Sequence, residues 1–183
     1  MKRLIPFCLF FFPLLSNAQS IEINKVDEFT GASIVRTSWE TLQKGMKQTV
    51  FFRLSKIDSS WYFDIKMMLP TGLQSTEIFS IDKDSKLMLR SDSGIVVTLY
   101  SLRYEVAGIG KGARGFAGSM AYGVEQSYFV SQNDLNNLTG HLYDKMRIYT
   151  TDGYVEFDLN RNRSRTINDA ALLVVAPAKP GRR

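Results

Sequence analysis

The stretch from Lys145 to Leu159 places the tightest constraint on the fold of this chain. Apolar and polar residues alternate on both sides of Asp152-Gly153, a dipeptide that favours a two-residue hairpin turn. A turn at that dipeptide pairs Thr151 with Tyr154. It gathers the apolar side chains on one face and leaves Tyr149 and Tyr154 on the outer face. The pattern predicts an antiparallel hairpin with one buried side.

Two further segments have the same pattern. A turn at Asp58-Ser59 places Leu54 opposite Phe63 on the inside and Arg53 opposite Asp64 on the outside. The loop Asp92-Ser93-Gly94 suits a type I turn with a bulge. It joins Lys86–Ser91 to Ile95–Tyr100 and puts Leu87, Leu89, Val97 and Leu99 on one face. Four more strands are predicted, at Ile21–Val26, Ile34–Glu40, Thr76–Ile81 and Val124–Val130.

Two helices interrupt the strands. Ser131 is placed to cap a helix that runs through Leu138, with Asp134 completing a capping box and Gly140 in the position of a left-handed C-terminal cap. A second helix is predicted to begin at Ser164 and to end before Pro177, since its apolar residues recur with helical spacing.

The predicted fold class is therefore mainly β, within the α+β group. We expect an antiparallel β-sandwich or a partly closed barrel with two short helices, one of them C-terminal. Residues 19–175 are expected to form a single β-rich domain. Residues 176–183 are small, basic and proline-containing, and are expected to be a disordered tail.

Residues 1–18 have the pattern of a signal peptide. Lys2 and Arg3 precede an apolar run from Leu4 to Leu15, and Ser16-Asn17-Ala18 supplies the small residues of a cleavage site. The run is shorter than the roughly 20 residues that a membrane span needs. We expect cleavage after Ala18, no transmembrane anchor after it, and a secreted or periplasmic location.

Charge and cysteine content then narrow the possible functions. The only cysteine, Cys8, lies in the predicted leader, so the exported chain would have no thiol nucleophile, disulfide or thiolate metal site. From Arg161 to the C-terminus there are six basic residues and one acid, Asp169, so the basic character comes from this end and not from a basic face. A nucleic-acid partner is not expected.

The glycine-rich segment from Gly108 to Gly118 is the most distinctive part of the body. It contains a formal G-x-G-x-x-G match, but the strand–helix context of a dinucleotide site is missing. One interpretation is a flexible loop between strands. The other gives the loop a binding role, in which Lys111 and Arg114 hold an anionic group.

No motif for catalysis or metal binding is complete. His141 is the only histidine, and no G-x-S-x-G frames a serine nucleophile. Asp158-x-Asn160-x-Asn162 has EF-hand spacing but lacks the glycine of that loop. Acids such as Asp64, Glu156 and Asp158 are expected on exposed strand faces. We therefore assign no catalytic residues, no metal and no cofactor.

Several segments together resemble a known group of sequences. They are 26–31 (VDEFTG), 52–56 (FRLSK), 78–83 (IFSIDK) and 146–154 (MRIYTTDGY). These segments resemble small uncharacterised secreted β-rich proteins of Bacteroidetes-type Gram-negative bacteria. The resemblance implies an exported β-rich domain and carries no known catalytic role.

The leading functional hypothesis is an exported, non-enzymatic binding or interaction module. Its candidate binding residues are Lys111 and Arg114 in the glycine-rich segment, and Tyr149 and Tyr154 on the outer face of their hairpin. The partner would be a protein or a glycan of the cell envelope. Two alternatives stay open: a β-barrel carrier of a small apolar molecule, and a hydrolase that uses carboxylates.

Overall fold

The computed structural model describes residues 19–46, 48–69, 79–113 and 121–176. The predicted leader, most of the predicted tail and Arg114 lie outside these ranges. Within them there are thirteen strands and two helices. The strands are β1 (Ile21–Val26), β2 (Ser33–Thr37), β3 (Glu40–Lys44), β4 (Thr49–Ile57), β5 (Ser60–Met68), β6 (Ser80–Ile81), β7 (Lys86–Ser91), β8 (Val96–Ser101), β9 (Glu105–Val106), β10 (Gly108–Ile109), β11 (Tyr122–Val130), β12 (Tyr143–Thr150) and β13 (Gly153–Asp158). The helices are α1 (Gln132–Gly140) and α2 (Arg161–Val175).

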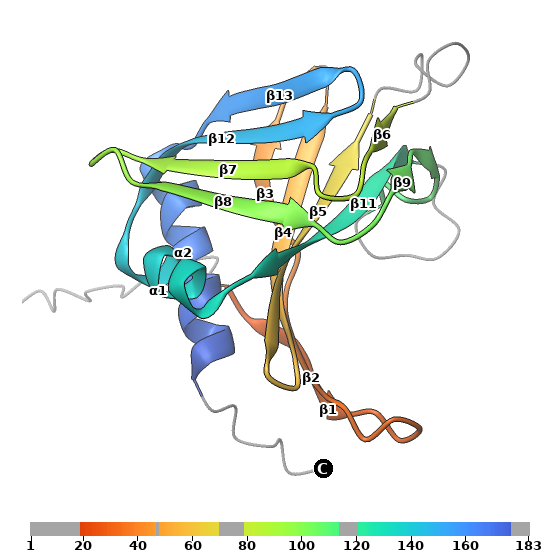
Figure 1. Cartoon of the computed structure of the whole chain (residues 1–183), viewed down its shortest axis with the longest axis vertical. Helices are drawn as coiled ribbons and strands as arrows, with labels where there is room; N and C mark the ends of the chain where they lie inside the picture. The colour runs from red at the N-terminus through yellow and green to blue at the C-terminus, as the bar shows by residue number, and fades with distance from the viewer. Residues whose placement is uncertain (1–18, 47, 70–78, 114–120, 177–183) are drawn as a thin grey trace, which may run out of the picture.

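Nearly all of the strands belong to one antiparallel sheet. Its order is β1-β2-β4-β5-β11-β8-β7-β12-β13, with β3 added beside β4 and β10 beside β11. The sheet bends, so β7, β8, β12 and β13 lie over β3, β4 and β5, while the helices lie at one end (Figure 1). Among the described strands β13 pairs only with β12, so the sheet is not closed into a barrel. The predicted class, mainly antiparallel β with a C-terminal helix, is confirmed.

The core lies between the two halves of the bent sheet. Phe52 and Phe63 stack there with ring centroids 5.4 Å apart, and both are fully buried. Helix α2 closes the open end by burying the face that carries Ile167, Ala171 and Val174. Within the described ranges no helix combines the length and the apolar character that a membrane crossing requires.

Two of the three predicted hairpins have the predicted register. In β4–β5, Leu54 lies opposite Phe63 and Arg53 lies opposite Asp64. In β7–β8, the four expected apolar residues are buried, and Gly94 takes a φ of +86° in the turn. In both cases local turn chemistry and the period-two pattern agree, and each hairpin is closed by residues close in sequence.

The register predicted for the third hairpin was wrong by two residues. Thr150 pairs with Gly153 and Tyr149 with Tyr154, so Thr151 and Asp152 form the turn. Gly153, with a φ of +120°, begins β13 in place of ending the turn. A shift of two residues keeps every side chain on its face, so Ile148 is still buried as expected.

Two predicted boundaries were also wrong. The strand expected over 34–40 breaks at Ser38-Trp39, because β2 pairs with the end of β4 and β3 with its beginning. Helix α2 begins at Arg161, where the side chain of Asn160 accepts from the Arg163 amide. The Ser164 hydroxyl instead accepts a hydrogen bond from the Tyr143 amide.

The end of α1 also differs from the prediction. The capping box of Ser131 and Asp134 is present as expected. Gly140, however, is the last residue of the helix, without a left-handed φ, and the C-cap is His141 in an extended conformation. The helix therefore ends without the glycine cap that the sequence pattern predicted.

Candidate functional site

Lys111 is held by an ion pair within the protein. Its Nζ lies 2.8 Å from Oε2 of Glu105 and donates to the carbonyl of Val106 at 3.0 Å. Glu105 also pairs with Arg103 at 2.6 Å. Burial alone would raise the pKa of Glu105, but the two cations together lower it. Arg114, which was predicted to bind an anionic group together with Lys111, lies outside the described residues, so the structure does not test that pairing.

Two glycines of the same region are required by close backbone packing. Gly123 of β11 pairs with Met68 of β5, and Gly112, just after β10, lies close to both of these strands. A Cβ on Gly123 would lie 2.1 Å from the carbonyl oxygen of Met67, and one on Gly112 would lie 2.7 Å from that of Tyr122. No side chain larger than hydrogen fits at those separations, so these glycines have a structural role.

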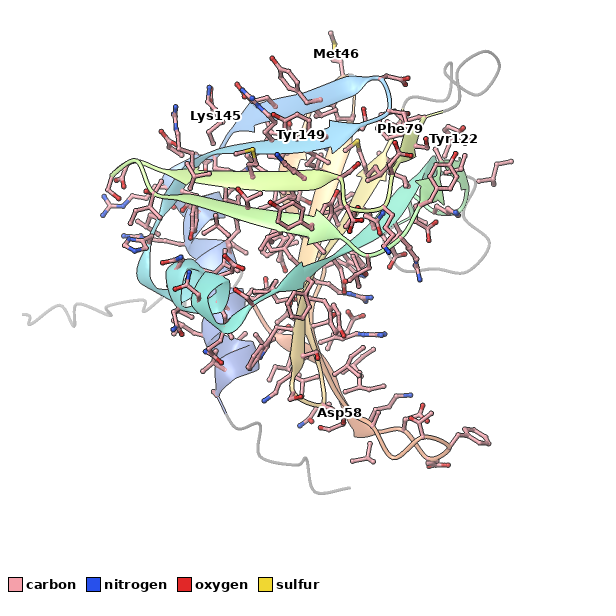
Figure 2. All side chains as sticks on the ribbon, viewed as in Figure 1. Met46, Asp58, Phe79, Tyr122, Lys145 and Tyr149 are labelled. Atoms are coloured by element: carbon pink, nitrogen blue, oxygen red, sulfur yellow. The ribbon has the colours of Figure 1, made fainter. Side chains whose placement is uncertain are left out.

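Tyr149 and Tyr154 face one another across β12 and β13. Their ring centroids are 5.9 Å apart, and the Arg147 guanidinium lies 4.4 Å from the Tyr154 ring. Glu156 lies on the same face. Its pKa is held below the usual range, mainly by a hydrogen bond from Arg147 and next by one from Lys145. Lys145 and Tyr149 are labelled on this hairpin in Figure 2. The two tyrosines lie on the outer face, as predicted.

A second surface lies on the other half of the sheet and was not identified from the sequence. On the side of β4 and β5 away from the core there is a hollow of about 450 Å³, which we call the outer pocket. It is lined by Arg36, Arg53, Ser55, Ile57, Tyr62, Asp64, Leu102, Arg103, Glu125 and Ser127. These residues come from β2, β4, β5, β11 and the loop after β8.

Asp64 is at the floor of the outer pocket and is saturated with donors. It is 4% exposed, which contradicts the prediction that this acid is on a solvated face. Its carboxylate accepts hydrogen bonds from Arg53 Nε at 3.0 Å and from Ser55 Oγ and Ser127 Oγ at 2.6 Å each. The three donors come from two neighbouring strands and hold this carboxylate in one orientation.

A second carboxylate, Glu125, lines the pocket, and residues next to the pocket hold its neighbours in place. Glu125 lies 3.3 Å from Lys66 Nζ and 3.7 Å from Arg53. The buried ring of Trp39 has the Arg53 guanidinium 4.3 Å and the Lys66 ammonium 4.6 Å from its centroid. Cation–π contacts of this kind add to the ion pairs that hold these two cations. Trp39 holds this position because it joins β2 to β3.

Arg36 differs from the other cations of the outer pocket. Its partner across the sheet is Ser55, and its Nε is buried with no hydrogen-bond partner in the structure. Arg53 pairs with Asp64, and Arg103 pairs with Glu105. Among the described residues, Arg36 is thus the cation of this pocket that has no carboxylate partner.

Aromatic side chains continue from the pocket along the outer face. Tyr62 is the cross-strand partner of Phe129, and Phe129 is the partner of Tyr100, so the three lie in register on β5, β11 and β8. The Tyr62 and Phe129 rings meet edge to face at 6.4 Å. Phe129 and Tyr100 are 47% and 49% exposed. We call these three residues the aromatic row.

Part of this surface could have been predicted from the sequence. The outward positions of β4 and β5 carry Arg53, Ser55, Tyr62 and Asp64, and the hairpin register pairs the first and last of these. The contribution of β11 could not be predicted, because the pairing of β5 with β11 joins strands far apart in sequence. Arg36 likewise reaches the pocket through the pairing of β2 with β4.

Two other residues considered in the sequence lie at helix ends. The His141 amide donates to the Asn137 carbonyl at the end of α1. Asn160 of the EF-hand-like spacing caps α2. In the described ranges no three side chains of histidine, cysteine, aspartate or glutamate gather as metal ligands would.

Comparison of the chain with protein-family models, with curated proteins and with solved structures found no match.

Proposed function

We propose that this protein is an exported, non-enzymatic binding module that holds a saccharide on the outer pocket and the aromatic row. The observation that carries the proposal is their adjacency. Tyr62 belongs to both, so a polar hollow continues directly into three aromatic residues in register. The exported location, secreted or periplasmic, rests on the leader pattern of residues 1–18 and on the resemblance to secreted proteins.

A saccharide fits this combination of chemistries. A sugar ring has hydroxyl groups, which donate and accept hydrogen bonds, and a C–H face that packs on aromatic rings. The outer pocket supplies both kinds of partner: guanidinium donors such as Arg103 and acceptors such as Glu125. Phe129 and Tyr100 supply the exposed aromatic surface. The volume of the pocket, about 450 Å³, lies within the usual range of small-ligand sites.

The site is also held in place before a ligand arrives. Its side chains stand on paired strands, and the ion pairs of Arg53 with Asp64 and of Lys66 with Glu125 fix their orientation. A site that is already ordered loses less conformational entropy on binding. Surface loops of the described chain contribute only Leu102 and Arg103 to the pocket.

The carrier and hydrolase alternatives find less support. The space between the sheet halves, where a carrier would hold an apolar molecule, is filled by fully buried side chains such as Phe52, Phe63 and Leu89. The carboxylates of the pocket are engaged by cations and hydroxyls, which leaves Asp64 in particular without room for a proton-transfer partner. We therefore favour binding over cargo transport or hydrolysis.

A glycan microarray of bacterial, plant and animal saccharides tests the proposal. The wild-type protein is expected to bind a defined subset of glycans. Phe129→Ala is expected to weaken that binding by roughly two- to tenfold, the range of a single aromatic contact. Tyr154→Ala, which removes an exposed aromatic ring from the other half of the sheet, is the matched control and is expected to bind normally.

Two outcomes would contradict the proposal. One is that no glycan binds to protein whose circular dichroism shows a folded sheet. The other is that Tyr154→Ala abolishes binding while Phe129→Ala leaves it unchanged, which would move the site to the surface of β12 and β13.

A further inference from the structure

Arg36 presents a buried donor that the protein itself does not satisfy. Its Nε is inaccessible to water and has no hydrogen-bond partner. A buried N–H without an acceptor costs free energy, and an arginine side chain stays charged at every physiological pH. The residue as a whole is only half-buried and lines the outer pocket, so an anion from outside the chain can approach its guanidinium even though Nε itself is covered.

The charges around Arg36 show what that partner must carry. Three arginines and two carboxylates line the outer pocket. Both carboxylates, Asp64 and Glu125, are already paired with Arg53 or Lys66, and Arg103 is paired with Glu105. One positive charge is left over in the pocket, and it belongs to Arg36.

We propose that the saccharide bound in the outer pocket is acidic and that its anionic group pairs with the guanidinium of Arg36. This inference rests on the proposed function and names the class of ligand. A carboxylate, sulfate or phosphate presents two oxygens to the planar fork of a guanidinium, so it can accept hydrogen bonds from this side chain and neutralise its charge together. The hydroxyl groups of Ser55 and Ser127 lie in the same pocket as further polar contacts.

The position of Arg36 makes the interaction selective. It lies on β2, and Ser55, its partner across the sheet, precedes the end of β4. The aromatic row begins on the next strand with Tyr62, the cross-strand partner of Ser55. A saccharide whose ring packs on the row can therefore direct an acidic substituent across two strands to Arg36.

The test measures binding of paired probes by isothermal titration calorimetry. The acidic probes are oligo-uronates and sulfated oligosaccharides, and the neutral probes are their carboxyl-reduced and desulfated counterparts. Acidic probes are expected to bind more tightly than neutral ones. Arg36→Gln is expected to reduce the affinity for acidic probes by roughly ten- to a hundredfold, the range of a charge-assisted hydrogen bond, and to leave neutral probes unchanged.

Two further variants sharpen the reading. Arg36→Lys keeps the charge but loses the planar fork, so an intermediate affinity is expected. Arg165→Gln removes the same charge from the exposed face of α2 and is expected to have no effect. If Arg36→Gln is not folded, the comparison of acidic with neutral probes on the wild-type protein decides by itself.

The outcomes separate this inference from the proposed function. Equal binding of acidic and neutral probes, both weakened in Phe129→Ala, would overturn the acidic ligand and leave saccharide binding in place. Failure of every saccharide would overturn both. Binding of a hexaglutamate peptide that depends on Arg36, with no saccharide bound, would also overturn both and assign the pocket to an acidic protein segment.

Discussion

Replacing Asp64 by alanine is expected to destabilise this protein strongly. The Asp64 side chain is 6% exposed, and the Arg53 side chain beside it is 13% exposed. Removing one member of a buried ion pair typically costs about 3–5 kcal/mol, because the other charge remains buried and unpaired. Arg53 retains Glu125 at 3.7 Å, so we expect the lower end, about 3 kcal/mol. For a chain of this length that corresponds to a fall of roughly 6–12 °C in melting temperature.

Urea denaturation and thermal melting, both followed by circular dichroism, measure the change. Asp144→Ala is the matched control, since Asp144 pairs with Arg90 at 2.8 Å but both side chains are about half exposed. Exposed pairs contribute little to stability, so its melting temperature is expected to stay close to that of the wild type. Similar losses in Asp64→Ala and Asp144→Ala would refute the reasoning from burial.

A double variant separates the unpaired charge from lost packing. Arg53→Met combined with Asp64→Leu removes both charges and fills the space with apolar atoms. Buried ion pairs can be replaced in this way with little loss of stability. The double variant is therefore expected to be more stable than Asp64→Ala, and a greater loss would mean that packing and not charge explains the first result.

The other predictions concern two glycines and the loss of stability at low pH. Gly123→Ala is expected to lower the melting temperature sharply, because its Cβ would lie 2.1 Å from a backbone oxygen. Gly140→Ala, with open space around it at the last position of α1, is expected to gain at most about 0.5 kcal/mol. A lower melting temperature in Gly140→Ala would instead support the left-handed conformation that the sequence pattern predicted for this glycine. Since the folded-state pKa of Glu156 is lowered, its pairing with Arg147 stabilises the protein above the unfolded pKa, and this contribution is lost as the pH falls through the folded pKa. The melting temperatures of wild type and Glu156→Gln are therefore expected to differ at pH 7 and to converge well below pH 4, and a constant difference would contradict the assignment.

Local patterns predicted much of the fold. The hairpins β4–β5 and β7–β8 follow from turn residues and alternation within short segments, and both were predicted in the correct register. The same reasoning failed by two residues at Gly153, because turns of similar length compete there and both keep Ile148 on the buried face. Hydrophobic burial selects the face of a strand, but it does not distinguish between registers that differ by two.

The candidate site was predicted only in fragments. Tyr149 and Tyr154 were placed on the correct face, and whether they bind a partner stays a prediction. Lys111 was one candidate for binding an anionic group, and that role stays a prediction. The structure adds that its ammonium pairs with Glu105, a contact that the sequence pattern did not predict. The prediction for Arg114 lies outside the described residues.

By itself, the sequence determined approximately where the longer strands and both helices lie, which of their faces are apolar, and where the leader pattern lies. These properties depend on neighbours within a few residues. Only the tertiary structure decided that β11 lies between β5 and β8 and that β2 lies beside β4. Those pairings bring Arg36, Asp64 and Phe129 to one surface. Many strand orders would bury the same apolar faces, so the order that creates the pocket is set by packing of the whole sheet and not by any one segment.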